Sequence, residues 1–226
     1  MKIVNLHSWD VSPKEAIWIQ REIRGKIIPF GKVEPVRWVA GADVAYDKRR
    51  HTTYAGVVIL RMSDLAVVET RIAECPTSFP YIPGLLSFRE APALVQALKK
   101  IQTEPDIIFI DGHGLSHPRS AGIASHIGLL TDRPVIGCAK SLLVGDYQDP
   151  PLTRGSQSNI YDEHPEIIGA VVRTRDEVKP VFVSIGHRID LDEAVRLTLS
   201  CGRGYRIPEP TRQADLLVEK VKRESQ

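Results

Sequence analysis

Two aspartates in this sequence occupy positions where an unpaired charge would be costly. Asp43 lies inside the run VRWVAGADVAYD, whose apolar neighbours predict a strand buried on both faces, and Asp111 closes the apolar run DIIFID. Burying a carboxylate without a partner costs on the order of several kcal/mol. Each acid therefore needs a basic side chain, several hydrogen bonds or a cation. For Asp43 taken alone, a structural salt bridge to an arginine explains the residue equally well.

A third acid, Glu90, stands in the short stretch SFREAP ahead of a predicted helix. By position it is either a functional carboxylate or a partner of the helix dipole. If the three acids converge, each close pair repels by about 4 kcal/mol at an effective dielectric constant of about 20, unless a divalent cation lies between them. Carboxylates without a nearby cysteine select hard cations, which favours Mg²⁺, with Mn²⁺ as a substitute.

The loop DGHGLSHPRS, which begins at Asp111, combines glycines with histidines. Gly112 and Gly114 let the backbone approach a flat ligand without a Cβ in the way. A zinc site at His113 and His117 is disfavoured, because their i, i+4 spacing falls in a loop rather than on a helix. A serine-hydrolase interpretation of GLSHP is disfavoured too, because the second glycine of G-x-S-x-G is missing.

The run FPYIPGLL holds an aromatic side chain on a stiff backbone. Tyr81 lies between Pro80 and Pro83, and a rigid aromatic wedge of this kind could stack on a base or displace it. The alternative is a proline-rich turn with Tyr81 packed on the core.

Lys140 and His187 each follow a β-rich run, and strand ends commonly deliver site residues. For either residue alone, a surface cation or a buried histidine with satisfied hydrogen bonds is the better interpretation.

The elements that must position these residues follow an α/β order. Ser12 and Glu15 form a capping box for a first helix, three β-rich runs over 37–47, 53–61 and 65–74 predict antiparallel strands, and Pro92 is expected at the start of a helix over 91–101. The rest of the pattern predicts strands at 105–111, 134–140, 166–174 and 180–186 and helices near 121–130, from 191 after an Asp190–Glu193 capping box, and from about 211. This order is typical of a mixed sheet with helices on its faces.

Composition bounds the protein class. The chain has 226 residues, of which 42% are hydrophobic and 26% charged, and this excludes intrinsic disorder and predicts one domain over residues 1–226. A formal net charge of +2 does not by itself indicate a protein that binds nucleic acid. The three cysteines form no C-x-x-C pair and are expected as buried thiols. No membrane span or signal peptide is recognisable, so we expect a cytoplasmic protein.

Taken together, several long motifs resemble the endonuclease V family over about Asp43 to Val195: GADVAYD, PYIPGLLSFRE, DGHGLSHPRSAGIASHIG, GCAKS and VSIGHRIDLDEAV. The resemblance implies a ribonuclease H-like α/β fold, a mixed β-sheet flanked by helices on both faces. It also implies a phosphodiester hydrolase of DNA repair that recognises deoxyinosine, the product of adenine deamination. Such an enzyme cuts the second phosphodiester bond 3′ to the lesion and leaves 3′-hydroxyl and 5′-phosphate ends.

By the same resemblance, Asp43 and Asp111 are expected to hold Mg²⁺ or Mn²⁺, and Glu90 to act directly or through a metal-bound water. Lys140 and His187 are expected to complete the phosphate environment.

The resemblance also assigns a wedge and a base pocket. Tyr81, Ile82, Pro83 and Gly84 would separate the strands, and the flipped hypoxanthine would lie against backbone near Gly84 and Gly112. The residues expected to line the pocket are Leu86, His117 and Ile123.

Two departures from the family pattern, Ile185 in VSIGH and Ser120 after HPR, concern the turn at His187 and the recognition loop. The partner is expected to be DNA containing deoxyinosine, and inosine-containing RNA is a second substrate hypothesis. A non-catalytic binding module and a generic ribonuclease H or resolvase are further alternatives. The presence of all three acids disfavours the binding module, and the wedge and the DGHGLSHPR loop separate the inosine-directed enzyme from the generic nuclease.

Overall fold

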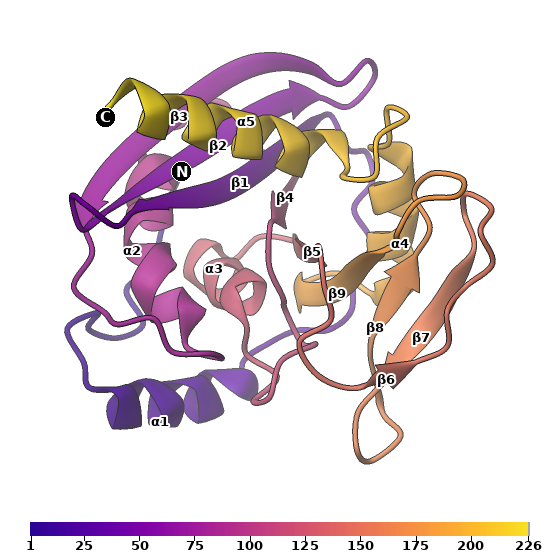
Figure 1. Ribbon diagram of the computed structural model, residues 1–226, viewed down its shortest axis with the longest axis horizontal. Helices are drawn as coiled ribbons and strands as arrows, with labels where there is room; N and C mark the ends of the chain where they lie inside the picture. The colour runs from indigo at the N-terminus through magenta and orange to yellow at the C-terminus, as the bar shows by residue number, and fades with distance from the viewer. Residues whose placement is uncertain (226) are drawn as a thin grey trace.

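Residues 1–225 are described by a computed structural model of the chain, and within them a nine-stranded sheet runs in the order β3-β2-β1-β4-β5-β9-β8-β7-β6 (Figure 1). The strands are β1 (Trp38–Asp47), β2 (Thr52–Arg61), β3 (Ala66–Pro76), β4 (Ile107–Ile110), β5 (Val135–Ala139), β6 (Asp146–Tyr147), β7 (Gln157–Tyr161), β8 (Ile167–Val172) and β9 (Val181–His187).

The half of the sheet formed by β1 to β5 sets the direction in which side chains are delivered. β1 and β2 pair antiparallel, as do β2 and β3, which confirms the three predicted antiparallel strands. β4 pairs parallel with both β1 and β5. The carboxyl ends of β1, β4 and β5 therefore point the same way, and in open α/β sheets ligands bind beyond such ends.

The other half of the sheet is antiparallel throughout. β9 pairs with β5 and with β8, and β7 lies between β8 and β6. The predicted strands at β8 and β9 are confirmed. The short strands β6 and β7 were expected as loop, because β7 (QSNIY) is largely polar and owes its conformation to pairing with β8 rather than to its own sequence.

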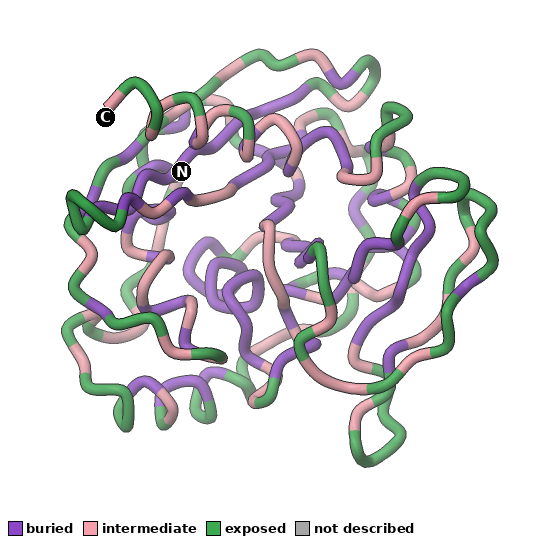
Figure 2. The backbone as a smooth tube through the Cα atoms, viewed as in Figure 1, coloured by how far each residue is buried: buried purple, intermediate pink, exposed green. Residues whose placement is uncertain are grey.

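Helices cover both faces of the sheet, as predicted (Figure 1). α2 (Leu86–Lys99) and α3 (Ile123–Thr131) pack on one face and α4 (Leu191–Ser200) and α5 (Glu209–Glu224) on the other, while α1 (Pro13–Arg24) packs against α2 and α3. The buried backbone in Figure 2 runs through the strands and α3. Within residues 1–225, no helix is both long and apolar enough to cross a membrane.

Alternating residues of β1 serve these two layers. Ala40 and Ala42 belong to the core under α2 and α3, whereas Val39 belongs to the core under α4 and α5. All three cysteines are buried free thiols, as expected.

The start of α2 differs from the prediction. The helix begins at Leu86 rather than near Pro92, which lies inside it. Phe88 is buried in the core shared with α1, and burial of this first turn compensates for the backbone hydrogen bond that proline cannot donate. As a result, Glu90 lies on the helix rather than in a stretch before it.

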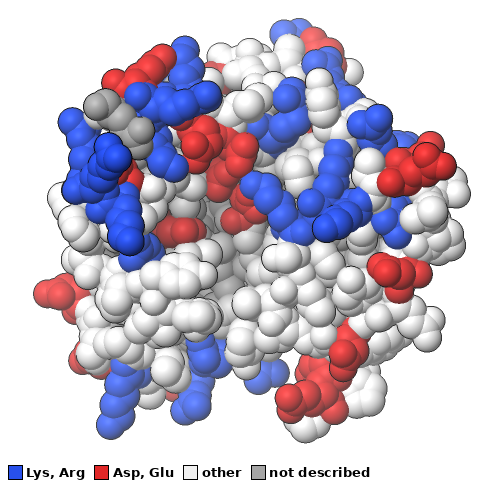
Figure 3. All heavy atoms as spheres, in the orientation of Figure 1, with Lys and Arg blue, Asp and Glu red and all other residues white. Residues whose placement is uncertain are grey.

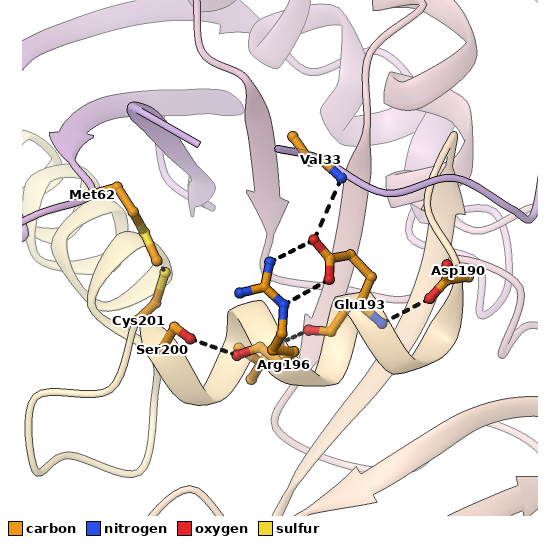
Figure 4. A network of polar contacts seen from close by, with 9 residues as sticks. Val33, Met62, Asp190, Glu193, Arg196, Ser200 and Cys201 are labelled. Carbon is orange, nitrogen blue, oxygen red and sulfur yellow. Dashed lines mark hydrogen bonds and ion pairs between the residues drawn. The ribbon is translucent and has the colours of Figure 1, made fainter. Parts of the chain in front are cut away.

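The two predicted capping boxes have different outcomes. At α1, the Ser12 hydroxyl and the Glu15 carboxylate bond reciprocally, as predicted. At α4, Asp190 accepts from the Glu193 N–H, but the Glu193 carboxylate binds Arg196 and the N–H of Val33 instead of returning to its cap (Figure 4). Only half of the second capping box is formed, because an arginine one turn away offers two charge-assisted bonds.

Candidate functional site

Three aspartates meet at the carboxyl ends of the parallel strands. Asp43 and Asp111 are neighbours because Ala42 pairs with Ile110, and the N–H of Asp111 donates to the carbonyl of Ala42 at 3.2 Å. Asp215 of α5 is the third member. Each offers one carboxylate oxygen, and these oxygens all lie within 4.8 Å of one another. The predicted convergence of Asp43 and Asp111 is confirmed.

Asp215 was missed by the sequence analysis. It lies four residues after Thr211 and three before Val218, both of which are buried, so it belongs to the stripe of α5 that faces the sheet. An acid in the middle of the buried stripe of an amphipathic helix was the available signal.

Two glycines let α5 come close enough to place Asp215. A Cβ on Gly41 would lie 1.9 Å from the carbonyl oxygen of Pro210, and one on Gly56 would lie 2.7 Å from Cγ1 of Val218. Gly41 is on the same face of β1 as Asp43, and Gly56 is the cross-strand partner of Asp43. The glycines therefore clear the surface on which α5 brings its carboxylate to the other two.

Burial and mutual repulsion act on these acids together. Burial, and after it the charge of Asp111, raises the pKa of Asp43 well above its usual range. Burial likewise raises the pKa of Asp111. The first half of β1 is buried on both faces as expected, whereas Asp43 itself is half-buried. Among the described residues, no ion pair joins Asp43 to an arginine, which removes the salt-bridge alternative.

Glu90 approaches the cluster from α2. Burial raises its pKa to about 8, and the charge of Asp111 adds to this shift. It is not one of the three acids whose oxygens lie within 4.8 Å of one another. Glu90 is thus within electrostatic reach of the cluster without belonging to its inner set.

Lys140, directly after β5, supplies the positive charge of the site. Its Nζ lies 2.6 Å from Oδ2 of Asp111 and 3.0 Å from Oδ1 of Asp215. The guanidinium of Arg206 donates to the backbone carbonyl of Lys140 and holds the strand end in place. The structure thus places Lys140 beside two of the acids.

His187 does not join the cluster, and this prediction is wrong. β9 runs antiparallel to β5, so His187 pairs with Val135, at the opposite end of β5 from Lys140. Four residues of strand separate these ends, about 13 Å at ~3.3 Å per residue. His187 is buried, accepts the N–H of Ile28 at Nδ1 and lies 3.4 Å from Asp132 through Nε2. It is a histidine of the core.

The donor set suits a hard divalent cation. Three carboxylates supply oxygen ligands only, and burial, which raises the pKa values of Asp43 and Asp111, makes their charged forms costly without a cation. Oxygen-rich, sulfur-free sites of this kind favour Mg²⁺ or Mn²⁺ over zinc or copper.

A cavity of about 260 Å³ opens beside the cluster. Its lining includes every residue predicted for the wedge and the base pocket, namely Tyr81, Ile82, Pro83, Gly84, Leu86, Gly112, His117 and Ile123. The side chain of Tyr81 is 71% exposed at its rim, so the alternative in which it packs on the core is wrong. The structure therefore brings the predicted pocket residues together, next to the acids.

Gly112 joins the pocket to the carboxylates, because it directly follows Asp111. Its φ of +156° is at the edge of the range that favours glycine, and a Cβ there would lie 2.6 Å from Cγ2 of Ile123. Only a glycine leaves this floor of the pocket open.

The pocket histidines are neutral at pH 7. Burial lowers the pKa values of His113 and His117 to about 4. Nε2 of His117 donates to the carbonyl of Gly84 and its Nδ1 accepts the N–H of Arg119. Both ring nitrogens of His117 are thus bonded within the protein, which leaves none for a zinc ion.

The face that carries the site is charged in a distinct pattern. Figure 3 shows acidic side chains beside a central hollow, with basic side chains on both sides of them. Such flanks suit a polyanion that crosses an acidic centre.

The fold and site define a nuclease of the ribonuclease H-like class. Two crystal structures with this fold superpose on the chain. The endonuclease V of Streptomyces avermitilis has a TM-score of 0.92 at 41% identity and covers 100% of this chain and 99% of its own. The endonuclease V of Ciona intestinalis, in complex with a 24mer DNA containing an inosine followed by a ribo-adenosine, has a TM-score of 0.83 at 29% identity and covers 95% and 100%.

The chain belongs to the endonuclease V family, whose family model matches residues 21–216. The endonuclease V of Trichormus variabilis is 50% identical over 218 residues, which cover 96% of this chain and 98% of the relative. That of Dehalococcoides mccartyi is 47% identical over 216 residues, 96% of each chain. The protein is therefore an enzyme and a nuclease, as the motifs predicted.

Proposed function

We propose that this nuclease recognises deoxyinosine in DNA and hydrolyses the second phosphodiester bond 3′ to it, leaving 3′-hydroxyl and 5′-phosphate ends. Its cofactor is Mg²⁺, with Mn²⁺ as a substitute, and its role is cytoplasmic DNA repair after adenine deamination. The Ciona relative with inosine-containing DNA supports the substrate class.

One observation carries the proposal: a pocket large enough to admit a flat base begins one residue away from a carboxylate cluster. Gly112 lines the pocket and Asp111 belongs to the cluster. An enzyme that reads a flipped base and cuts nearby needs both features at a fixed separation, because unstacked bases are read in pockets while phosphates are cleaved at cations.

Asp43, Asp111 and Asp215 would hold the cation, and Glu90 would bind it directly or through a water molecule. When bound, the cation lowers the pKa of water and neutralises charge on the scissile phosphate. The carboxylates would hold the ion with oxygens from strand β1, from the residue directly after β4 and from helix α5.

Lys140 would bind the phosphate once a cation takes over the charge of the aspartates. In the structure its ammonium bridges Asp111 and Asp215. Lys140 would be held less tightly by Asp111 and Asp215 if these acids bound a cation, and its ammonium would then be available to a phosphate oxygen at the same strand end.

Tyr81 would fill the space that the extruded base leaves. Extrusion costs a few kcal/mol, less when pairing is already weak, and stacking on an aromatic ring returns roughly 1–3 kcal/mol. Hypoxanthine differs from guanine only by lacking the 2-amino group. A pocket closed by Gly84 and Gly112 could therefore reject guanine by its size.

The test is cleavage of an end-labelled duplex with one deoxyinosine, beside the undamaged duplex and a strand with ribo-inosine, in Mg²⁺ or in EDTA. We expect Mg²⁺-dependent cutting one nucleotide beyond the inosine by the wild type, and its loss in Asp43→Ala. Asp149→Ala, which changes an exposed aspartate outside the cluster, is the matched control and should cut like the wild type.

Other outcomes would overturn parts of the proposal. Equal cutting of the undamaged duplex would indicate a generic nuclease, and stronger cutting of the ribo-inosine strand an RNA-directed enzyme. Binding without cutting in every metal tried would contradict the chemistry altogether.

A further inference from the structure

The carbonyl oxygen of Gly84, at the base of the wedge, accepts hydrogen bonds from three side chains on two separate segments. Nε2 of His117 donates at 2.9 Å, Nη2 of Arg119 at 2.6 Å and Nε2 of Gln20 at 3.0 Å. A carbonyl oxygen has two lone pairs, so three donors are more than one for each lone pair. The position of this one peptide group is strongly constrained.

The turn that carries this carbonyl already defines its local shape. The N–H of Leu85 donates to the carbonyl of Ile82 at 3.0 Å, with Pro83 and Gly84 at the central positions. Gly84 has φ +78°, and a Cβ there would lie 2.7 Å from Nη2 of Arg119. Proline followed by a glycine at positive φ is typical of a type II turn. The turn fixes its own backbone shape, but it does not fix the distance between Gly84 and the opposite wall of the pocket.

Gln20 of α1 connects the two walls. Besides the carbonyl of Gly84, its Nε2 donates to the carbonyl of Ala121 at 3.1 Å, and its Oε1 accepts Nε of Arg119 at 2.6 Å. Gly84 belongs to the wall on the wedge side, and Ala121 directly precedes Gly122 on the wall at the start of α3. One carboxamide thus bridges both walls from behind the cavity.

The burial of Gln20 is unusual for its chemistry. It is fully buried on the otherwise apolar stripe of α1 formed by Ala16, Ile19 and Ile23. Burying an amide is costly unless its polar atoms are all bonded, and an apolar side chain would suit helix packing as well. The presence of an amide at this buried position therefore indicates that its hydrogen bonds have a function of their own. Gln20 also lies just outside residues 21–216, which match the family model.

We propose that Gln20 is a positioning residue for base selection: its carboxamide sets the width of the pocket by tying Gly84 and Ala121 together and by orienting Arg119. This inference rests on the proposed function, since base selection requires that a base enter the pocket. A pocket free to widen would admit the 2-amino group of guanine.

The variants follow from the bonds. Gln20→Glu keeps the shape and the acceptor for Arg119 but loses both donors, and it sets a carboxylate against two carbonyl oxygens. Gln20→Leu keeps the size and loses every bond. Glu22→Gln, on the exposed side of the same helix, is the matched control.

The readout is kcat/KM on duplexes that carry hypoxanthine or guanine at the same position, with unfolding measured in parallel. We expect the preference for hypoxanthine over guanine to fall by about 10- to 100-fold in both Gln20 variants and to stay unchanged in Glu22→Gln. A purely structural amide would lower stability but leave the preference intact, and that result would overturn the inference, as would failure of both variants to fold.

A second measurement needs no substrate. Hydrogen exchange of the free protein should speed up in residues 81–85 and 120–124 of Gln20→Glu, and unchanged exchange there would contradict the proposed tie. If the wild type does not cut deoxyinosine DNA at all, the proposed function is wrong. Faster hydrogen exchange in Gln20→Glu would still show that Gln20 connects the two walls of the pocket.

Discussion

At the scale of single residues, the site concentrates negative charge where burial makes it expensive. Asp43 and Asp111 both have raised pKa values, first because of burial. Lys140 offsets part of this charge through its contact with Asp111. A cation bound by these acids would offset this loss of stability, because a ligand that binds only the folded state stabilises it.

Asp43→Asn should therefore raise stability without metal and reduce the stabilisation that metal provides. In EDTA we expect a higher Tm than the wild type, since a buried charge next to Asp111 is removed. The increase in Tm on adding Mg²⁺ should shrink, at about 2–4 °C per kcal/mol of binding energy lost for a chain of this size. Thermal unfolding in both buffers measures this, with Asp149→Asn as control. Equal Mg²⁺ effects in variant and wild type would contradict a site at Asp43.

Tyr81 offers a test of the wedge that stability does not confound, because its side chain is 71% exposed. Tyr81→Ala should weaken binding of a deoxyinosine duplex by roughly 1–3 kcal/mol, the value of one stacked base, without lowering Tm. Tyr81→Trp should retain the affinity. Fluorescence anisotropy in Ca²⁺ or EDTA measures the binding without cleavage, and an unchanged affinity in Tyr81→Ala would rule out stacking.

At the scale of elements, helix α5 is a structural part of the candidate site, because it carries Asp215. It reaches the sheet only because Gly41 and Gly56 leave room, and in that position Asp215 meets Asp43. The contact is backbone against backbone at Gly41, where nothing can rotate away.

Gly41→Ala should accordingly lower stability by about 3 kcal/mol or more, at the upper end of the cost of overpacking, and reduce cleavage by displacing Asp215. Urea unfolding and single-turnover cleavage measure the two effects. Gly25→Ala is the control, since a Cβ there would meet nothing within 4 Å and φ is −67°. Near-wild-type activity in Gly41→Ala would show that α5 does not need this approach.

Helix α3 is held to the N-terminal segment by two histidines. Nε2 of His7 and Nε2 of His126 lie 2.6 Å apart. Nδ1 of His7 donates to the carbonyl of Ser8, so His126 is the donor between the two rings. Burial, and after it the charge of His7, lowers the pKa of His126 to about 3.

This contact predicts a pH dependence with a defined sign. Below pH 6.5 the unfolded chain binds a proton on His126, which the folded chain does not bind until about pH 3, so stability falls as pH falls through this range. Relative to His126→Phe, the wild type should lose about 1 kcal/mol between pH 7.5 and 5.5. Urea unfolding at both values measures the difference, and parallel losses would refute the shift.

At the scale of the whole molecule, one sheet connects the catalytic end to the pocket and to both helix layers. The sheet order interleaves early and late segments, with β9 beside β5 and α5 across β1. Neither half of the chain can form its part of the sheet and its helix cover alone. We therefore propose that residues 1–226 form one domain.

One domain should unfold in one step. Far-UV circular dichroism and tryptophan fluorescence should give coincident urea transitions, since Trp9, Trp18 and Trp38 report the N-terminal part and circular dichroism the entire fold. Two separated transitions would show that the proposal of one domain is wrong.

The local sequence determined much of the secondary structure. Apolar runs and capping residues predicted the order of the strands along the chain and most of the helices, because hydrophobic periodicity and capping are local properties. The apolar setting of Asp43 and Asp111 and the stiff backbone around Tyr81 indicated their chemistry, since burial cost and backbone rigidity follow from neighbours in the chain. The resemblance of several motifs to the endonuclease V family predicted that the pocket residues would lie close together.

Tertiary structure alone decided the rest. Asp215 and Gln20 are brought to the site by packing between segments more than 60 residues apart, at Gly41 and at Gly84. His187 is taken away from it by the antiparallel register of β9. Spacing along a chain says which face of an element a residue lies on, but strand direction and helix docking determine which end of the sheet it reaches.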